Sequence, residues 1–126
     1  MLTFGNKRIY LACGVTDMRK QINGLCVIVQ ESFQLDPFDA ALFVFCNRGR
    51  DRLKILEWDG DGFWLYFKRL EKGHFQWPHQ GRAASGASPG DEPTMTLTGE
   101  DLAVLLGGVR VGLKLRRQEV LERNIS

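Results

Sequence analysis

The sequence predicts an α+β fold: an antiparallel β-meander of about five strands, with an amphipathic helix packed on one face and a short C-terminal helix. Apolar residues recur at helical spacing between residues 17 and 34. Short segments of strand-like composition, separated by tight turns, occupy residues 41–77, and strands joined by such turns must be antiparallel. The chain has 126 residues, 44% of them hydrophobic, which is enough for one packed core.

The first predicted elements are a strand at residues 7–13 and a helix at about 17–34. The strand segment, KRIYLAC, is short, β-branched and aromatic, and glycines flank it. Either Thr16 or Asp17 can cap the helix that follows. A proline after Asp36 ends the helix, because the residue before proline is steered away from helical geometry. The apolar stripe of this helix consists of Met18, Ile22, Leu25, Val29 and Phe33.

Four further strands are predicted, at residues 41–46, 52–58, 63–70 and 74–77. The sequence Asp59-Gly60-Asp61-Gly62 is a strong hairpin signal, because glycine and aspartate tolerate positive φ angles. Shorter turn signals at residues 47–49 and 71–73 connect the other strands. Together with the helix, these strands predict an α+β core that spans residues 1–80.

The C-terminal third of the chain is predicted to be a flexible loop at 81–95, followed by a helix and a basic tail at 96–126. Its residues 81–93 are rich in Gly, Ala, Ser and Pro and contain no large apolar side chain. A capping-box-like sequence from Thr98 to Asp101 starts the helix, and its apolar stripe is Leu102, Leu105, Leu106 and Val109. The tail beyond Arg110 fits either a second amphipathic helix or a frayed basic arm.

Composition argues against several classes of protein. No apolar run is long enough to cross a membrane, and the N-terminus lacks the apolar stretch of a signal peptide. Cys13, Cys26 and Cys46 are odd in number and widely spaced, so they predict neither a disulfide framework nor a zinc site. We therefore expect a cytoplasmic protein with reduced thiols, no membrane association and no cofactor.

The candidate binding site is a row of cations. Arg48, Arg50, Arg52 and Lys54 occupy every second position, which in an extended strand puts all four on one face. A core does not accept four adjacent cations, so this face meets either water or an anion. Aromatic residues in the same region offer planes for bases or sugars. The complete set of predicted DNA-binding residues is Arg48, Arg50, Arg52, Lys54, Lys68, Arg69, Arg19 and Lys20.

No catalytic constellation is evident in the sequence. Asp59 and Asp61 could form a metal-binding pair, but they are better explained as turn residues. The other nearby acids, Asp51, Glu57 and Glu71, each stand beside a cation. Neither histidine has an evident Ser or Cys partner, and the sequence contains no phosphate-binding loop. We therefore expect a protein that is not an enzyme.

Several of these segments match a known family. The motifs are GVTDMRK at residues 14–20, DPF at 36–38, KIL-x-WDG at 54–60 and KRLE-x-G-x-F-x-WP at 68–78. Together they resemble the TnpB (Orf2-like) accessory protein of the insertion-sequence-sixty-six transposon family. The resemblance extends from about Gly14 to Gly108.

The resemblance implies a role in bacterial DNA transposition. Members of this family come from mobile elements that encode two small proteins and a large DDE-type transposase. The small protein is needed for efficient transposition, whereas the transposase cuts and joins DNA. The implied partners are therefore transposon-end DNA, the large transposase and the other small protein of the element.

Two readings of the function remain open. In the first, the protein binds transposon DNA through the basic strand face. In the second, it is an interaction module that docks on the transposase or forms a homodimer, without touching DNA. The residues expected to bind a protein partner are Trp64, Tyr66, Trp77 and Leu105.

Overall fold

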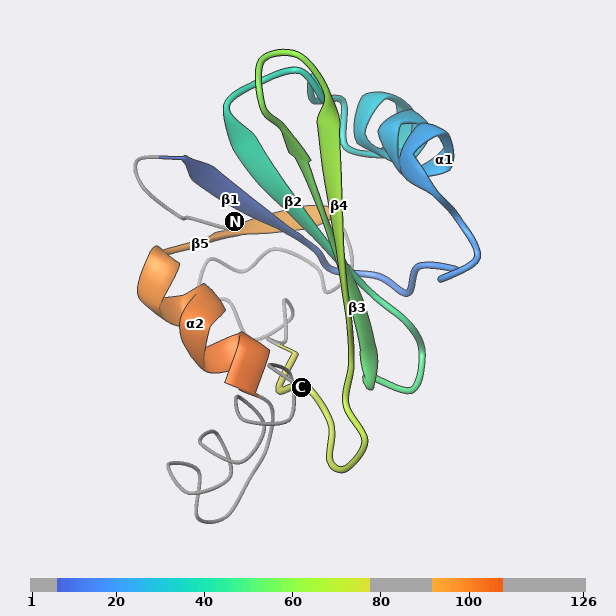
Figure 1. Cartoon of the computed structure of the whole chain (residues 1–126), viewed down its shortest axis with the longest axis vertical. Coiled ribbons are helices and arrows are strands. Elements are labelled where there is room, and N and C mark those ends of the chain that lie inside the picture. Colours follow the sequence, from blue (N-terminus) through green and yellow to red (C-terminus); the bar gives the residue numbers. More distant parts are fainter. Residues whose placement is uncertain (1–6, 78–91, 108–126) are drawn as a thin grey trace.

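The computed structural model describes residues 7–77 and 92–107. Within these ranges the chain forms a five-stranded sheet that lies between two helical segments (Figure 1). The elements are β1 (Arg8–Ala12), α1 (Ile22–Val27), the π-helix η1 (Ile28–Ser32), β2 (Ala41–Cys46), β3 (Arg52–Trp58), β4 (Phe63–Arg69), β5 (Thr94–Leu97) and α2 (Gly99–Gly107). The predicted α+β class is confirmed.

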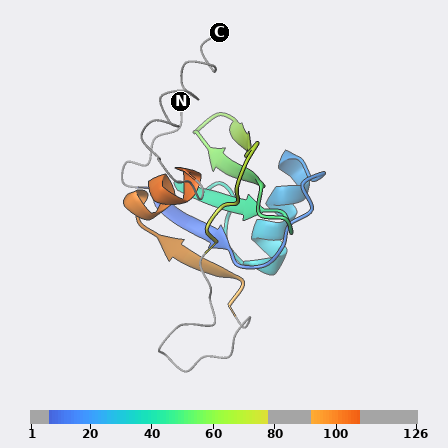
Figure 2. The ribbon, with the colours of Figure 1, turned by 90° about the horizontal axis from the view of Figure 1, so that it is seen from below.

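The sheet is mixed rather than fully antiparallel. Its strand order is β4-β3-β2-β1-β5, and Figure 2 shows the strands in this order with α1 on one side and α2 on the other. Strands β2, β3 and β4 form the predicted antiparallel meander, with Val44 opposite Ile55. Strand β1 instead runs parallel to β2, with Tyr10 opposite Phe43. This pairing is possible because α1 and η1 lie in the connection between the two strands.

The fifth strand is not the one expected from the sequence. Residues 74–77 form no strand; Phe75 and Trp77 are buried in the core, whereas His74 and Gln76 are exposed. The backbone N–H of Phe75 donates to the carbonyl of Arg50 over 2.7 Å, and the Trp77 indole donates to the carbonyl of Ala12 over 2.9 Å. Residues 94–97 form β5 instead and pair antiparallel with β1.

The boundaries of the predicted loop and tail are only partly covered by the structure. Thr94 and Met95, which the sequence assigned to the loop, lie in strand β5. The rest of that loop up to residue 91, and the tail from residue 108, lie outside the described residues. The division into core, loop and tail stays a prediction.

The first helix begins later than predicted. Residues 17–20 form a turn in which the side chain of Asp17 accepts a hydrogen bond from the backbone N–H of Arg19. The helix starts at Ile22 after Gln21, which makes no side-chain cap, and continues as η1 to Ser32. Of the predicted apolar stripe, Leu25 and Val29 are buried against the sheet and Ile22 and Phe33 are partly buried beside them, whereas Met18 packs there from the turn before the helix.

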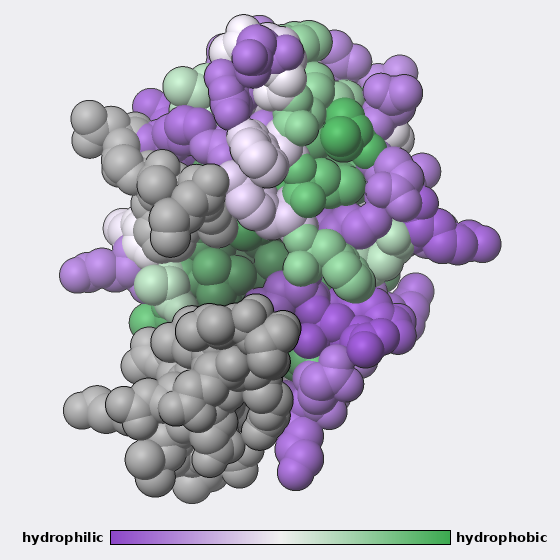
Figure 3. All heavy atoms as spheres, in the orientation of Figure 1, coloured by the Kyte–Doolittle hydropathy of each residue, from purple (hydrophilic) through white to green (hydrophobic). Residues whose placement is uncertain are grey.

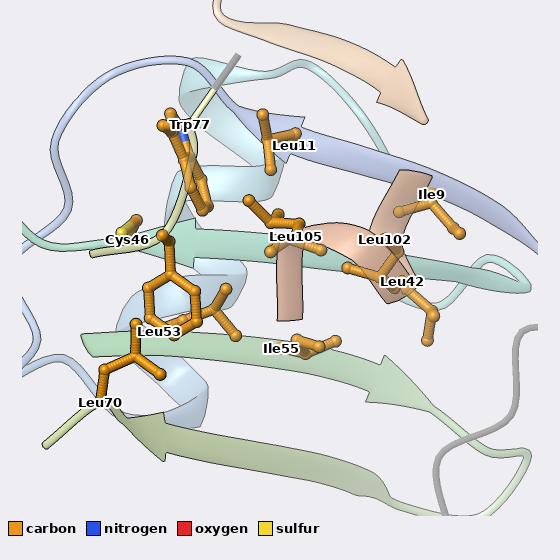
Figure 4. Close-up of a cluster of buried hydrophobic side chains, with 12 residues drawn as sticks. Ile9, Leu11, Leu42, Cys46, Leu53, Ile55, Leu70, Trp77, Leu102 and Leu105 are labelled. Carbon is orange, nitrogen blue, oxygen red and sulfur yellow. The ribbon is translucent and has the colours of Figure 1, made fainter. Parts of the chain in front are cut away.

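Each face of the sheet has its own apolar cluster. On the α2 side, Leu102 and Leu105 pack on residues of β1, β2 and β3 (Figure 4). On the α1 side, Leu25 and Val29 pack on Phe43 of β2. Burying a side chain of this size contributes about 1.5–3 kcal/mol. Strand β2 is buried along its whole length because it is covered on both faces.

Helix α2 begins at the predicted capping box. The Thr98 hydroxyl accepts a hydrogen bond from the N–H of Asp101 over 3.0 Å, and the Asp101 carboxylate accepts one from the N–H of Thr98 over 3.1 Å. Each bond satisfies an amide that the helix itself leaves unpaired.

Candidate nucleic-acid interface

A hollow of about 740 Å³ opens on the α1 side of the sheet, next to the turn between β2 and β3. Its cations come from three places: Arg19 precedes α1, Arg48 lies in the turn, and Arg52 begins β3. Its apolar lining is Val15, Met18, Leu65 and Phe67. In Figure 3 hydrophilic side chains gather at the lower right, over this turn and the segment before α1. We call this feature the basic hollow.

Asn47 builds the turn that carries Arg48. Its side-chain oxygen accepts hydrogen bonds from the backbone N–H groups of Asp51 and Arg52 at 3.1 and 3.0 Å. Its side-chain nitrogen donates to the Asp51 carboxylate over 2.7 Å. This hydrogen bond is the main reason that the pKa of Asp51 is lowered. Arg48 is left exposed at the tip.

Arg52 and Arg69 lie directly opposite each other on β3 and β4, and both are exposed. Arg69 is paired with Glu71 at 3.0 Å. Arg52 forms no ion pair with any residue in 7–77 or 92–107. Like charges opposite each other destabilise a strand pair, so an anion placed between them would be favourable.

Arg19 is held by its neighbour Asp17. Two nitrogens of the guanidinium contact the carboxylate, the closer at 2.8 Å. These hydrogen bonds lower the pKa of Asp17 to about 2. Both side chains are open to solvent, and ion pairs of this kind contribute little stability. Arg19 can therefore exchange this partner for a phosphate.

Lys54 is not part of an exposed row, and this prediction is wrong. Its residue is only 6% exposed. Its ammonium donates to the backbone carbonyl oxygens of Met18 at 2.9 Å and Lys20 at 2.8 Å. Lys54 thus forms the floor of the basic hollow and fastens the segment before α1 to the sheet. The Lys20 side chain, also predicted to bind DNA, is exposed nearby.

Four of the predicted cations do not line the hollow: Lys20, Arg50, Lys68 and Arg69. Arg50 precedes strand β3 and has a left-handed backbone, with φ of 60°, so strand alternation does not place it beside Arg48. Its guanidinium carbon lies 5.2 Å from the centre of a Trp77 ring. Lys68 lies on the opposite face of the sheet, where it donates to the carbonyl of Leu106. The every-second-residue rule failed because only Arg52 and Lys54 of the four are in the strand.

Phe67 is a site residue that the sequence did not single out. Its side chain lines the basic hollow, its residue is 56% exposed, and the Lys54 ammonium lies 5.8 Å from its ring centre. The sequence could have identified it, because side chains alternate along a strand and Phe67 lies two residues before Arg69, a predicted DNA-binding residue. Both side chains are therefore on the same face of β4. The hollow therefore combines arginines with an exposed aromatic ring.

The predicted partner-binding residues divide into two groups. Trp64 is 48% exposed and stacks on Tyr66, with ring centres 6.0 Å apart. Trp77 and Leu105 are 8% and 4% exposed and belong to the core on the α2 side (Figure 4). Placing these last two on a partner surface was wrong. Both side chains lie on the buried, apolar side of their segment. The spacing of apolar residues in the sequence does not tell such a buried side from an exposed apolar patch.

The acidic turn at residues 59–62 is structural. The N–H of Asp59 donates to the carbonyl of Gly62 over 2.9 Å, and the Asp59 carboxylate accepts a hydrogen bond from the Trp64 indole over 2.5 Å. Gly60 has φ of 95°, which favours glycine. Within the described ranges, no three potential ligands gather at one point for a metal ion. The three cysteines are free, and none of the described helices is long and apolar enough to span a membrane.

Comparison with known proteins identifies a family. The model of the "IS66 Orf2 like protein" family matches residues 7–116. Uncharacterized protein y4hO of Sinorhizobium fredii strain NGR234 is 43% identical over 84 residues, which cover 67% of this chain and 73% of that protein. Uncharacterized protein y4jC of the same strain is 36% identical over 94 residues, covering 75% and 80%. No solved structure matches the chain significantly.

Proposed function

This chain belongs to the IS66 Orf2-like protein family, and from this premise we propose that it is a non-catalytic accessory protein of DNA transposition that binds DNA through the basic hollow. The family supports the transposition role. The observation that carries the DNA contact is the convergence of Arg19, Arg48 and Arg52 from three separate segments on one hollow. The DNA that we propose is the transposon end.

The chemistry of the hollow suits a nucleic-acid backbone. Guanidinium groups bind phosphate oxygens through paired hydrogen bonds, and Arg48 and Arg52 have no competing ion pair among the described residues. Phe67 adds an exposed ring within the same hollow, where a sugar or an unstacked base can pack. Contacts of this kind give affinity with little sequence preference.

Fluorescence anisotropy with a labelled transposon-end duplex tests this proposal. If the three arginines each neutralise one phosphate, raising the salt concentration from 50 to 200 mM weakens binding roughly 40-fold. The double variant Arg48→Ala/Arg52→Ala should bind more weakly and lose about two thirds of the salt dependence. Arg8→Ala is the matched control, because Arg8 is an exposed arginine on β1 that does not line the hollow. No binding at 50 mM salt, or an equal loss in the control, would contradict the proposal.

A second candidate function is docking on the large DDE transposase of the element, alone or with its other small protein. The observation that favours it is the 48% exposure of Trp64, which is high for so large an apolar side chain. Co-purification with the transposase should then survive nuclease and high salt and should fail for Trp64→Ala. Loss of the complex on nuclease treatment would show that DNA bridges the two proteins.

A further inference from the structure

Strand β4 is an edge strand with an unpaired outer side among the described residues. It spans seven residues and pairs only with β3. In Figure 1 it lies at the front of the molecule, and its first five residues, Phe63 to Phe67, are all apolar or aromatic. A long apolar edge with free N–H and C=O groups is a site for strand addition, and proteins normally protect such edges.

The sequence of β4 is complementary to itself. Two copies of β4 can pair antiparallel about a two-fold axis perpendicular to the sheet. The same face of both copies then points the same way, so odd-numbered residues must lie opposite odd-numbered residues and even-numbered opposite even-numbered. With Leu65 on the axis, Phe63 faces Phe67 of the second copy and Trp64 faces Tyr66 of the second copy. Every position from 63 to 67 then opposes an apolar or aromatic side chain, the pairs that stabilise strand pairing best.

The same register also matches charges. Beyond the apolar segment, the same register brings Arg69, the last residue of β4, next to the Asp59–Gly62 turn of the second copy, which carries Asp61. Asp61 is exposed and forms no ion pair with the described residues. Among the residues that the structure describes, Arg69 forms one ion pair, an exposed one with Glu71, which it can share. Opposite charges meet twice because of the symmetry.

We propose that β4 pairs with β4 of a second copy of this chain, centred on Leu65, to form one continuous sheet through a homodimer. At this interface the rings of Trp64 and Phe67 are covered only on the flank that faces the second copy, so the side of Phe67 that lines the basic hollow stays open. Because the α1 faces of both copies lie on the same side, the two basic hollows also lie on the same side of the joined sheet. The dimer does not depend on DNA binding.

Sedimentation equilibrium of the full chain without DNA tests the dimer. We expect a mass twice the 14.3 kDa of one chain. Phe67→Glu puts a charge opposite Phe63 of the second copy and should yield a monomer. Val104→Glu is the matched control, because Val104 is 74% exposed on α2 and should leave the dimer intact. Circular dichroism verifies that both variants are folded.

A charge-exchange cycle tests the register. Asp61→Lys and Arg69→Glu each create two like-charge contacts and should raise the dimer dissociation constant about threefold to tenfold, whereas the double variant should recover it. The proposal would be overturned if the wild-type chain stayed monomeric at its highest soluble concentration. That result is expected if another segment or another protein covers β4. A double variant no better than the single ones would also overturn the proposal. Since no DNA is present, neither result bears on the basic hollow.

Discussion

The ammonium nitrogen of Lys54 lies 2.8 Å from the backbone carbonyl oxygen of Lys20. A second bond, to the carbonyl of Met18, fixes both ends of the turn that carries Arg19. Strand β3 thus positions an arginine that is 35 residues away in sequence without touching its side chain. A buried cation here organises the rim of the basic hollow.

Replacing Lys54 by methionine should destabilise the fold. The variant keeps the apolar stem but leaves two backbone carbonyls without their donor, which costs about 1–3 kcal/mol. Urea unfolding followed by tryptophan fluorescence measures this loss. DNA affinity should also fall, because the turn that holds Arg19 is released.

Lys72→Met is the control for this experiment, because Lys72 is exposed in the turn after β4. Its free energy of unfolding should stay within about 0.5 kcal/mol of wild type. If Lys54→Met instead kept full stability and lost only DNA affinity, Lys54 would contact DNA directly. That outcome would contradict its role as a buried donor to two backbone carbonyls.

Asp17 competes with DNA for Arg19, so Asp17→Asn should strengthen DNA binding. The substitution removes the negative charge that holds the guanidinium, while the amide oxygen can still accept the backbone N–H of Arg19. We expect about a twofold to fivefold gain in affinity at low salt, because an exposed ion pair holds its arginine only weakly. Anisotropy titrations measure it.

The control for this gain is Asp39→Asn, since Asp39 is exposed and does not line the hollow. Removing its charge changes the net charge of the protein by the same amount. An equal gain in both variants would mean that overall charge, rather than release of Arg19, controls the affinity.

The local part of this fold was predictable from the sequence, whereas the pairing of distant segments was not. The Asp59–Gly62 turn, the meander from β2 to β4 and the Thr98 capping box all rest on residues close in sequence. Strand β1 was expected as a strand, but its parallel partner is set by the α1 crossover. Strand β5 is a four-residue segment whose one strand partner among the described residues is β1, which is distant in sequence, so local composition gave no signal.

The candidate site was predictable in composition but not in arrangement. Arg19, Arg48 and Arg52 were expected to bind DNA, and they line one hollow. The strand-alternation rule gave the correct face for Lys54, yet that face is covered by the turn before α1. A lysine that satisfies two carbonyls is indistinguishable in sequence from a solvated one.

Trp77 should be more important for stability than the exposed Trp64. Trp77→Phe removes the indole N–H that donates to the Ala12 carbonyl and reduces the aromatic surface on which Arg50 packs, which should cost about 1–3 kcal/mol. Trp64→Phe should cost less than about 1 kcal/mol, because nearly half of that residue is already exposed. Urea unfolding of both variants measures the difference. Equal costs would mean that Trp77 is not part of the core.

Tyr66 makes stability depend on pH at the alkaline end. Burial, followed by its hydrogen bond to Glu57 and the charge of that carboxylate, raises the pKa of Tyr66 to about 12. The folded state therefore favours the protonated phenol, so this stability is fully present below the unfolded pKa of about 10 and is lost as pH rises from 10 toward 12. Urea unfolding at pH 9, 10 and 11 should show wild-type stability converging on that of Tyr66→Phe, which lacks this titration. Other alkaline groups act equally on both proteins, so a constant difference between the two would contradict the raised pKa.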